Sequence, residues 1–406
     1  MNDPVPATIK SMRASRPAPA GAPQGITLMI LGSLPSLAIA ALVPVLPLLF
    51  VKFKDAPHKE LLVPMILTVP SLCVALFSSA IGAAADFWGR RPVLILGLVA
   101  LAVFGMAPML FDGLYAIIAS RFVVGLAEAA ILTTGNALMG DYFAGDERKR
   151  WLGIQTSVGP FIGSAYIVTG GLLGNWSWRG PFLLYGMGLV VLIAAWYALH
   201  EPSQPDTREA LLPDRVASHF PWRETVLVGS VTLLVSAVYF LQAVQHGRIF
   251  SDLGVSTPGR IGWIVTLASM GTVVGGLTYK TMRLRPVSTM MSLAFAAYGV
   301  GYLGLSLVPN YVIGLPFDAL SQFAGGLALP LLIAWALTKY DFEHRGRGMG
   351  IWAACFFLGQ FLSPPLMTLI GHGTLSFLAT VGVVGGACLL IATVAWYLGK
   401  SADALA

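Results

Sequence analysis

Charged residues are scarce in this chain. Asp, Glu, Lys and Arg make up 11% of its 406 residues, whereas the hydrophobic types make up 56% and the mean hydropathy is +0.76. Soluble globular domains carry about 25% charged residues. So few charges cannot cover the surface of soluble domains, and the 45 Gly and 26 Pro fall inside apolar runs, as they do in membrane helices. The composition therefore excludes a soluble protein and indicates an integral membrane protein built of helices.

The chain also lacks the residue patterns of metal and cofactor sites. Its three cysteines, Cys73, Cys355 and Cys388, form neither a disulfide framework nor a zinc spacing. No two of its six histidines lie within a helical turn of each other, and the sequence contains neither H-E-x-x-H nor G-x-x-x-x-G-K-[ST]. We therefore expect no metal, no cofactor, no direct use of ATP and no enzymatic activity. A membrane-embedded enzyme and a non-transporting sensor stay open as remote alternatives.

Twelve apolar segments are long enough to cross a bilayer, which takes about 20 residues each. They are residues 26–51, 61–84, 92–111, 114–140, 151–175, 181–199, 224–249, 260–280, 287–308, 315–338, 348–370 and 374–398. A polar stretch with four prolines separates the sixth segment from the seventh. The chain is thus predicted to consist of a disordered tail (1–25), a six-helix half (26–199), a central loop (200–223) and a second six-helix half (224–406).

The positive charges predict the orientation. Of the 25 Lys and Arg residues, 18 fall on the face that holds both termini and the central loop, and six fall on the opposite face. Lys and Arg accumulate in cytoplasmic loops. We therefore expect a multi-pass protein of the cell (inner or plasma) membrane with both termini in the cytoplasm. Because most of these charges lie in short loops, the net charge of +6 does not indicate nucleic-acid binding.

An internal repeat supports the division into halves. Residues 113–127 read GLYAIIASRFVVGLA and residues 314–328 read GLPFDALSQFAGGLA, with 7 of 15 positions identical. The fourth span therefore corresponds to the tenth. Two related six-helix halves around a central site are a transporter architecture.

The loop between the second and third spans carries a motif. Residues 82–92 read G-A-A-A-D-F-W-G-R-R-P, which closely resembles the G-x-x-x-D-x-x-G-R-[RK] signature of the major facilitator superfamily. In that family the motif and an acid at the end of the fourth span latch the two halves together on the cytoplasmic side. The resemblance assigns this role to Gly82, Asp86, Gly89, Arg90, Arg91 and Asp141. In the alternative interpretation, the two arginines are positive-inside residues only.

The fourth span carries two charges. Arg121-Phe-Val-Val-Gly125 resembles the family's R-x-x-x-G motif, and Glu128 follows seven residues after the arginine. Seven residues return to the same face of a helix about 10 Å further along. Ionisable residues at such depth are costly and commonly functional. We therefore regard Glu128 as the candidate proton-coupling residue, with a permanently neutral, hydrogen-bonded glutamate as the alternative.

The fifth span resembles the G-P-x-x-G-G motif of antiporters in the superfamily. The matching residues are Gly153, Gly159, Pro160 and Gly163, and Ser164 replaces the final glycine of the motif. The resemblance favours efflux. A plain packing face of small residues explains the same glycines.

Polar residues also follow one stripe of the seventh span. Tyr239, Gln242 and His246 lie at i, i+3 and i+7, with Gln245 beside them. By resemblance, spans 1, 4, 7 and 10 line the cavity, so these four residues and Arg121 and Glu128 are candidate substrate contacts. His246 has the alternative of an ordinary residue near the outer interface. Asp318 is expected near the outer end of its helix, where it would complement the helix dipole.

Together these features predict an all-α membrane protein with the major facilitator fold. The function we expect is proton-coupled efflux of a small organic molecule by antiport, through alternating access. The expected partners are a small-molecule substrate, protons and the lipid bilayer, and we expect a functional monomer. The alternative is a proton-coupled uptake symporter for a small organic acid or another metabolite, with Arg121 binding the anion.

Overall fold

The computed structural model describes residues 21–202, 220–341, 344–371 and 374–403. Residues 1–20 of the expected tail and 203–219 of the expected central loop lie outside this range. Within the described residues, twelve helical spans are long and apolar enough to cross a membrane, which confirms the predicted number. The first helix begins at Ala22, four residues before the expected start, because Pro23 suits a first turn and the Gly21 amide donates to the Gln24 side chain.

Several spans consist of more than one helix. In the first half the elements are α1 (Ala22–Ala40), η2 (Val43–Val45), α2 (Leu46–Lys52), α3 (Lys59–Trp88), α4 (Arg90–Met106), η3 (Ala107–Met109), α5 (Leu114–Tyr142), α6 (Gly145–Gly174), η4 (Gly180–Gly186) and α7 (Met187–Ala198). In the second half they are α8 (Trp222–Asp252), α9 (Pro258–Ala268), α10 (Met270–Met282), α11 (Val287–Leu307), α12 (Tyr311–Thr338), α13 (Arg345–Gly371) and α14 (Phe377–Asp403). Prolines at positions 44 and 47 coincide with the irregular η2 segment of the first span.

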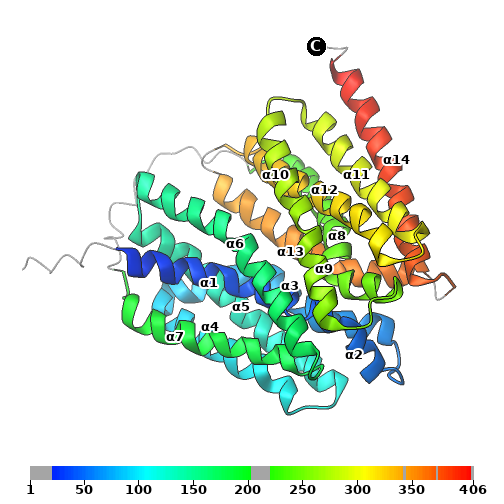
Figure 1. The fold of residues 1–406 in the computed structure, drawn as a ribbon. Coiled ribbons are helices and arrows are strands. Elements are labelled where there is room, and N and C mark those ends of the chain that lie inside the picture. The colour runs from blue at the N-terminus through cyan, green and yellow to red at the C-terminus, as the bar shows by residue number, and fades with distance from the viewer. Residues whose placement is uncertain (1–20, 203–219, 342–343, 372–373, 404–406) are drawn as a thin grey trace, which may run out of the picture.

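The spans run alternately up and down, so the bundle has two ends. We call the end that holds Ala198 and Trp222 the linker side, and the end that holds Lys52, Gly174 and Asp252 the far side. In Figure 1, α1–α7 and α8–α14 lie side by side as two bundles. Each has an apolar core, and the core of the first bundle also includes Phe240 and Val244 of α8.

The repeated sequence forms the same contact in both bundles. Helix α5 packs against α3 and α4, and α12 packs against α10 and α11. Gly125 of the first copy lies directly against Pro70 and Cys73 of α3, and Gly326 of the second copy lies against Thr272 of α10. A side chain at either glycine would collide with the neighbouring helix, which explains why the residue is glycine in both copies.

The two halves meet most closely at the far side. The backbone of Gly171 (α6) lies against Pro258 (α9), and that of Gly247 (α8) lies against Val43 (η2). The Gly259 amide donates to Asn175 Oδ1 at 3.0 Å across the same boundary. Backbones in such contact leave no passage between the halves, so the far side is closed.

Candidate functional site

The buried cation of the first half is tightly held. Arg121 of α5 is fully buried, and its Nη2 donates to the backbone carbonyls of Phe104 and Gly105, both at 2.8 Å. Its guanidinium carbon also lies 5.1 Å and 4.8 Å from the ring centroids of Phe182 and Tyr185 in η4. All these partners belong to the first half. The side chain of Arg121 therefore points into that bundle, where these hydrogen bonds and ring contacts stabilise its charge.

Glu128 lies two turns further along α5, at the middle of the span. Its side chain is 4% exposed, and Oε1 has no hydrogen-bond partner among the described residues. The charge that acts on it electrostatically is Arg121, which also has an unpartnered nitrogen, Nη1. A buried carboxyl group without a direct ion pair is stable when it is protonated and costly when it is ionised. The arrangement is therefore suited to binding and releasing a proton.

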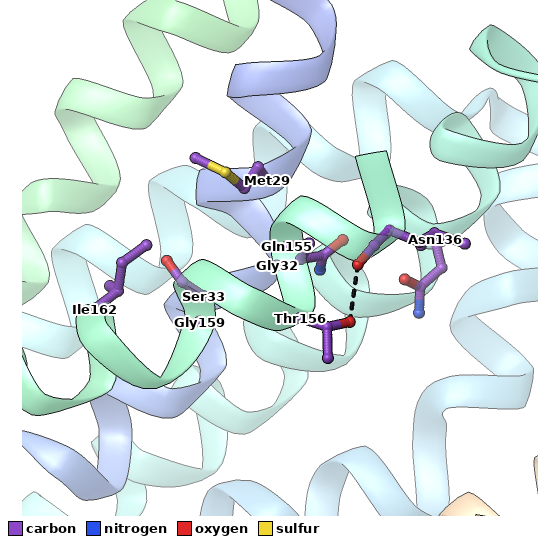
Figure 2. A pocket seen from close by; sticks show the side chains of 9 residues that line it. Met29, Gly32, Ser33, Asn136, Gln155, Thr156, Gly159 and Ile162 are labelled. Atoms are coloured by element: carbon purple, nitrogen blue, oxygen red, sulfur yellow. Dashed lines mark hydrogen bonds between the residues drawn. The ribbon is translucent and has the colours of Figure 1, made fainter. Parts of the chain in front are cut away.

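A pocket opens beside this cluster, toward the linker side. It has a volume of about 340 Å³ and lies between α1, α5 and α6. Figure 2 shows the polar groups around it: Ser33 on α1, the amide of Asn136 on α5, and Gln155 and Thr156 on α6. The apolar part of the wall comes from Met29, Leu152 and Ile162. Uncharged hydrogen-bonding groups and apolar side chains together fit a small, partly polar organic molecule.

A smaller hollow links the pocket to the depth of Glu128. It shares Gly32, Asn136 and Gln155 with the pocket and is also lined by Ile131 and Leu132 of α5. Leu132 lies four residues from Glu128 and therefore one helical turn away on the same face. The pocket residue of α5 is Asn136, eight residues from Glu128, so a molecule in the pocket would lie about two turns from the carboxyl group.

The antiporter-like motif of α6 faces open space. No atom lies within 4 Å of where a Cβ would stand on Gly153, Gly159 or Gly163, and Gly159 lines the pocket. Pro160 lies inside the helix. The glycines are therefore not packed against another helix in this conformation. The interpretation of these glycines as a packing face would require such a contact.

The polar stripe of α8 lies inside the second half. Tyr239 packs against Gly325 of α12, and Gln242, Gln245 and His246 are all at least 97% buried. Gln242 Nε2 donates to the backbone carbonyl of Asp318 at 3.1 Å and also to its carboxylate. These side chains contact the protein interior rather than the linker-side pocket.

Asp318 does not have the place expected from the sequence. It lies two turns inside α12, is fully buried and contacts His246, with 3.2 Å between its Oδ1 and His246 Nε2. The dipole of a helix acts mainly within its first turn, and Asn310 already caps α12 by accepting from the Val312 and Ile313 amides. The dipole interpretation is therefore corrected: Asp318 belongs to a polar network between helices.

The motif in the loop between the second and third spans (residues 82–92) forms a charge cluster at the linker side. Arg90 pairs with Asp141 and, at 3.4 Å, with Asp86. Gly89 separates α3 from α4 with φ of +99°, which a residue with a side chain rarely adopts. Gly82, one turn before Asp86, lies close to Thr133 of α5.

Glu201 completes this cluster. Its two carboxylate oxygens accept from the Arg90 and Arg91 amides at 2.7 and 2.8 Å, which satisfies the first turn of α4. The Arg91 side chain donates to the Trp196 carbonyl at 2.8 Å. Among the described residues, the partners of this cluster all belong to the first half or to the start of the central segment.

Sequence reasoning missed several of these groups. Gln155 and Thr156 are polar residues inside an apolar span, and that signal could have identified them. Glu201 follows the last residue of the sixth span and had no such signal, because its partners lie more than 100 positions earlier. The contact of Gln155 was likewise not visible in the sequence: its amide lies against Gly32 of α1, where any larger residue would displace it.

Comparison with known proteins gives consistent results. The sequence profile described as Major Facilitator Superfamily matches residues 28–251 and 231–404. The chain is 26% identical over 388 residues to the class C tetracycline resistance protein of Escherichia coli, covering 90% of this chain and 94% of that protein. It is 28% identical over 231 residues to the multidrug efflux pump Tap of Mycolicibacterium fortuitum, covering 53% and 55% of the two chains.

A solved structure has the same fold. It is a bacterial homolog of the human lysosomal transporter Spinster, in an inward-facing and unoccupied conformation. The superposition has a TM-score of 0.72 at 16% sequence identity and covers 92% of this chain and 96% of the other. This likeness confirms the fold predicted from the motifs.

Proposed function

The chain belongs to the major facilitator superfamily and is a membrane transporter rather than an enzyme, and on this basis we propose that it exports a small organic molecule in exchange for protons. The tetracycline and multidrug efflux relatives support the direction of transport. The antiporter-like residues of α6, of which Gly159 lines the pocket, support it as well. Because of its charge distribution, we place the protein in the cell membrane with both termini in the cytoplasm. We propose that it acts as a monomer.

The conformation fits the loading step of an exporter. The far side is closed by contacts between backbones of the two halves, whereas the pocket opens toward the linker side. With the linker side in the cytoplasm, substrate enters the pocket between α1, α5 and α6 from the cytoplasm. Rocking of the halves then closes this side and opens the other.

The observation that carries the proposed coupling is the unpartnered, buried carboxyl group of Glu128. A charge at the middle of a span costs about 2.5–3.5 kcal/mol on insertion scales. Closed states therefore favour the protonated acid, and a state that admits water releases the proton. A substrate in the pocket, about two turns away along α5, changes the environment of the same helix, so proton and substrate compete.

The uptake alternative relied on Arg121 as an anion-binding residue. In this structure two backbone carbonyls and two aromatic rings already surround its guanidinium. An organic anion would have to displace these partners to reach it. We therefore assign Arg121 to the support of α4, η4 and Glu128, and not to direct contact with substrate.

The test is transport in proteoliposomes with the pH gradient imposed or abolished. The compound panel begins with tetracycline and includes small organic acids. We expect Glu128→Gln to lose accumulation driven by the pH gradient while downhill exchange survives. The matched control is Glu147→Gln, the same change at an exposed acid of α6, which should behave like the parent. A Glu128→Gln protein that still concentrates substrate with the pH gradient as sole driving force would exclude Glu128 as the coupling acid.

A further inference from the structure

The second half contains a buried acid of its own. Asp318 is fully buried in α12, and one of its oxygens, Oδ2, has no hydrogen-bond partner among the described residues. Its other oxygen accepts from Gln242 and lies 3.2 Å from His246 Nε2. His246 is 3% exposed. A carboxyl group and an imidazole thus contact each other in a space that water does not reach.

A network of polar side chains fixes the pair between three helices. Gln322 Nε2 lies 3.4 Å from His246 Nε2, and the Thr272 hydroxyl donates to Gln322 Oε1 at 3.1 Å. The Ser321 hydroxyl donates to the Asp318 carbonyl at 2.8 Å. The pair is therefore held by α8, α10 and α12 together, and its geometry changes when these helices move.

Among the residues that the structure describes, no other charged group forms an ion pair with Asp318 or His246. Tyr302 of α11 faces Asp318, but its hydroxyl donates to the Val238 carbonyl at 2.7 Å. Arg248, two residues beyond His246, is paired with Glu60 of α3, and Arg260 of α9 donates to the Tyr311 hydroxyl. The η2 segment against α8 contains no titratable residue. Further titratable side chains of the packed elements lie at separate contacts or near the helix ends, including Lys52, Tyr239, Asp252, Tyr279, Lys280, Tyr298 and Cys355.

We propose that Asp318 and His246 form a second proton-binding site, which holds one proton while the far side is closed. With one proton the pair has no net charge, whether the imidazolium faces a carboxylate or the neutral imidazole faces a carboxylic acid. Loss of that proton leaves a buried negative charge, and gain of another leaves a buried positive charge, both of which are costly without water. Burial therefore favours the singly protonated pair.

The position of the pair connects it to the far side. Gly247, the next residue after His246, lies against Val43 of the other half, and Arg248 crosses to Glu60. Separation of the halves here exposes this part of α8 and lets water approach the pair. The proton then leaves to water: the bond from nitrogen or oxygen to hydrogen breaks, the electron pair stays on that atom, and hydronium forms. The inference does not require Glu128 to be the coupling acid.

The test uses far-side opening as its readout and needs no substrate. Val43→Cys is introduced into protein whose three native cysteines are replaced by alanine and whose Glu128 is replaced by glutamine, so that the first-half acid does not contribute. Alkylation of this cysteine by a membrane-impermeant maleimide is measured in proteoliposomes between pH 5 and 9. Coupling free energies between linked sites correspond to about 5- to 150-fold. Each rate is divided by that of N-acetylcysteine at the same pH, because formation of the thiolate by itself accelerates alkylation at alkaline pH. We expect this corrected rate to become at least about fivefold faster toward alkaline pH, where the pair loses its proton.

Single replacements distinguish the contributions of Asp318 and His246 to the pH profile. Asp318→Asn leaves a single histidine, so opening should become favoured at acid pH instead. His246→Gln leaves a single carboxyl group, so opening should remain favoured at alkaline pH with a displaced midpoint. The double variant should lose this pH dependence. Asp112→Asn, the same change at an exposed far-side acid whose partners all lie in the first half, should retain the parent profile. A parent-like profile in Asp318→Asn or in the double variant would overturn the proposal, as would a pH-independent parent.

Discussion

The two ends of the bundle are organised differently. At the far side, charged and aromatic groups cross from one half to the other: Arg248 of α8 pairs with Glu60 of α3 and lies between the rings of Phe50 and Phe377, 4.6 and 4.2 Å from their centroids. At the linker side, the cluster of Arg90, Asp86 and Asp141 stays within the first half.

This difference shows which contacts belong to which state. Contacts that cross between the halves exist only while that end is closed, so they stabilise this conformation. A cluster confined to one half is present in every conformation that keeps the half intact, and it affects the equilibrium only through partners that it gains when the linker side closes. Changes at the two ends should therefore shift far-side opening in opposite directions.

The largest effect is expected from Gly171→Ala. A Cβ at this position would lie 2.6 Å from the Pro258 carbonyl oxygen and 3.3 Å from the Gly259 Cα, both in the other half. Such overpacking costs about 1–3 kcal/mol, which should shift the equilibrium toward far-side opening by roughly 5- to 150-fold. The measurement is alkylation of Val43→Cys from the far side. Gly163→Ala on the same helix meets open space, and equal reactivity of the two variants would contradict far-side closure.

A smaller shift in the same direction is expected from Arg248→Ala. It removes one partly exposed ion pair and two cation–π contacts, together about 1–2 kcal/mol. Far-side alkylation should accelerate by about 5- to 30-fold. Arg179→Ala is the matched control, because Arg179 pairs with Asp112 and lies 4.7 Å from the Trp178 ring centroid, all within the first half. A faster reaction in the control would show that crossing between halves is not what matters.

Changes in the linker-side cluster should slow far-side alkylation instead of accelerating it. If the cluster latches the halves when the linker side closes, Asp86→Asn or Arg90→Ala removes stabilisation of the outward-open state, on the order of 1 kcal/mol. We expect severalfold lower transport and slower far-side alkylation, with membrane insertion unchanged. Lys149→Ala removes a more exposed ion pair, with Asp146, on the same side and should change neither. Unaltered transport in both cluster variants would exclude the latch.

The smallest effect is expected from Asp112→Asn, at the far side, on the melting temperature as the pH is lowered. The hydrogen bond from Lys52 and the charges of Lys52 and Arg179 lower the pKa of Asp112 below its usual value of 3.8. A carboxyl group whose pKa is lower in the folded state stabilises the fold above its unfolded pKa, and this contribution disappears as the pH falls through the folded pKa. Asp112→Asn should therefore reduce the melting temperature slightly at pH 6, and this reduction should shrink as the pH falls below 3.8. Since these contacts stay within one half, far-side alkylation should not change.

Much of the fold could be predicted from local sequence. Spans follow from apolar runs that match the thickness of a bilayer, and the pairing of halves follows from a repeat whose glycines, Gly125 and Gly326, occupy equivalent close contacts between helices. The position of Glu128 on the face of Arg121 also follows from helical periodicity. These features depend on residues within one helix or on the backbone of its neighbour.

The tertiary structure alone decided the partners. Asp318 lies 72 positions from His246, and Arg90 lies 111 positions from Glu201. Periodicity gives the face of a helix on which a residue lies, but not which neighbour that face meets, because helix tilt and rotation depend on packing across the whole bundle. The sequence by itself determined a twelve-span transporter with charges at specified depths. Which end is closed, where the pocket lies and which helix supplies the partner of each buried charge depend on how the two halves pack, because the same sequence is compatible with more than one arrangement of them.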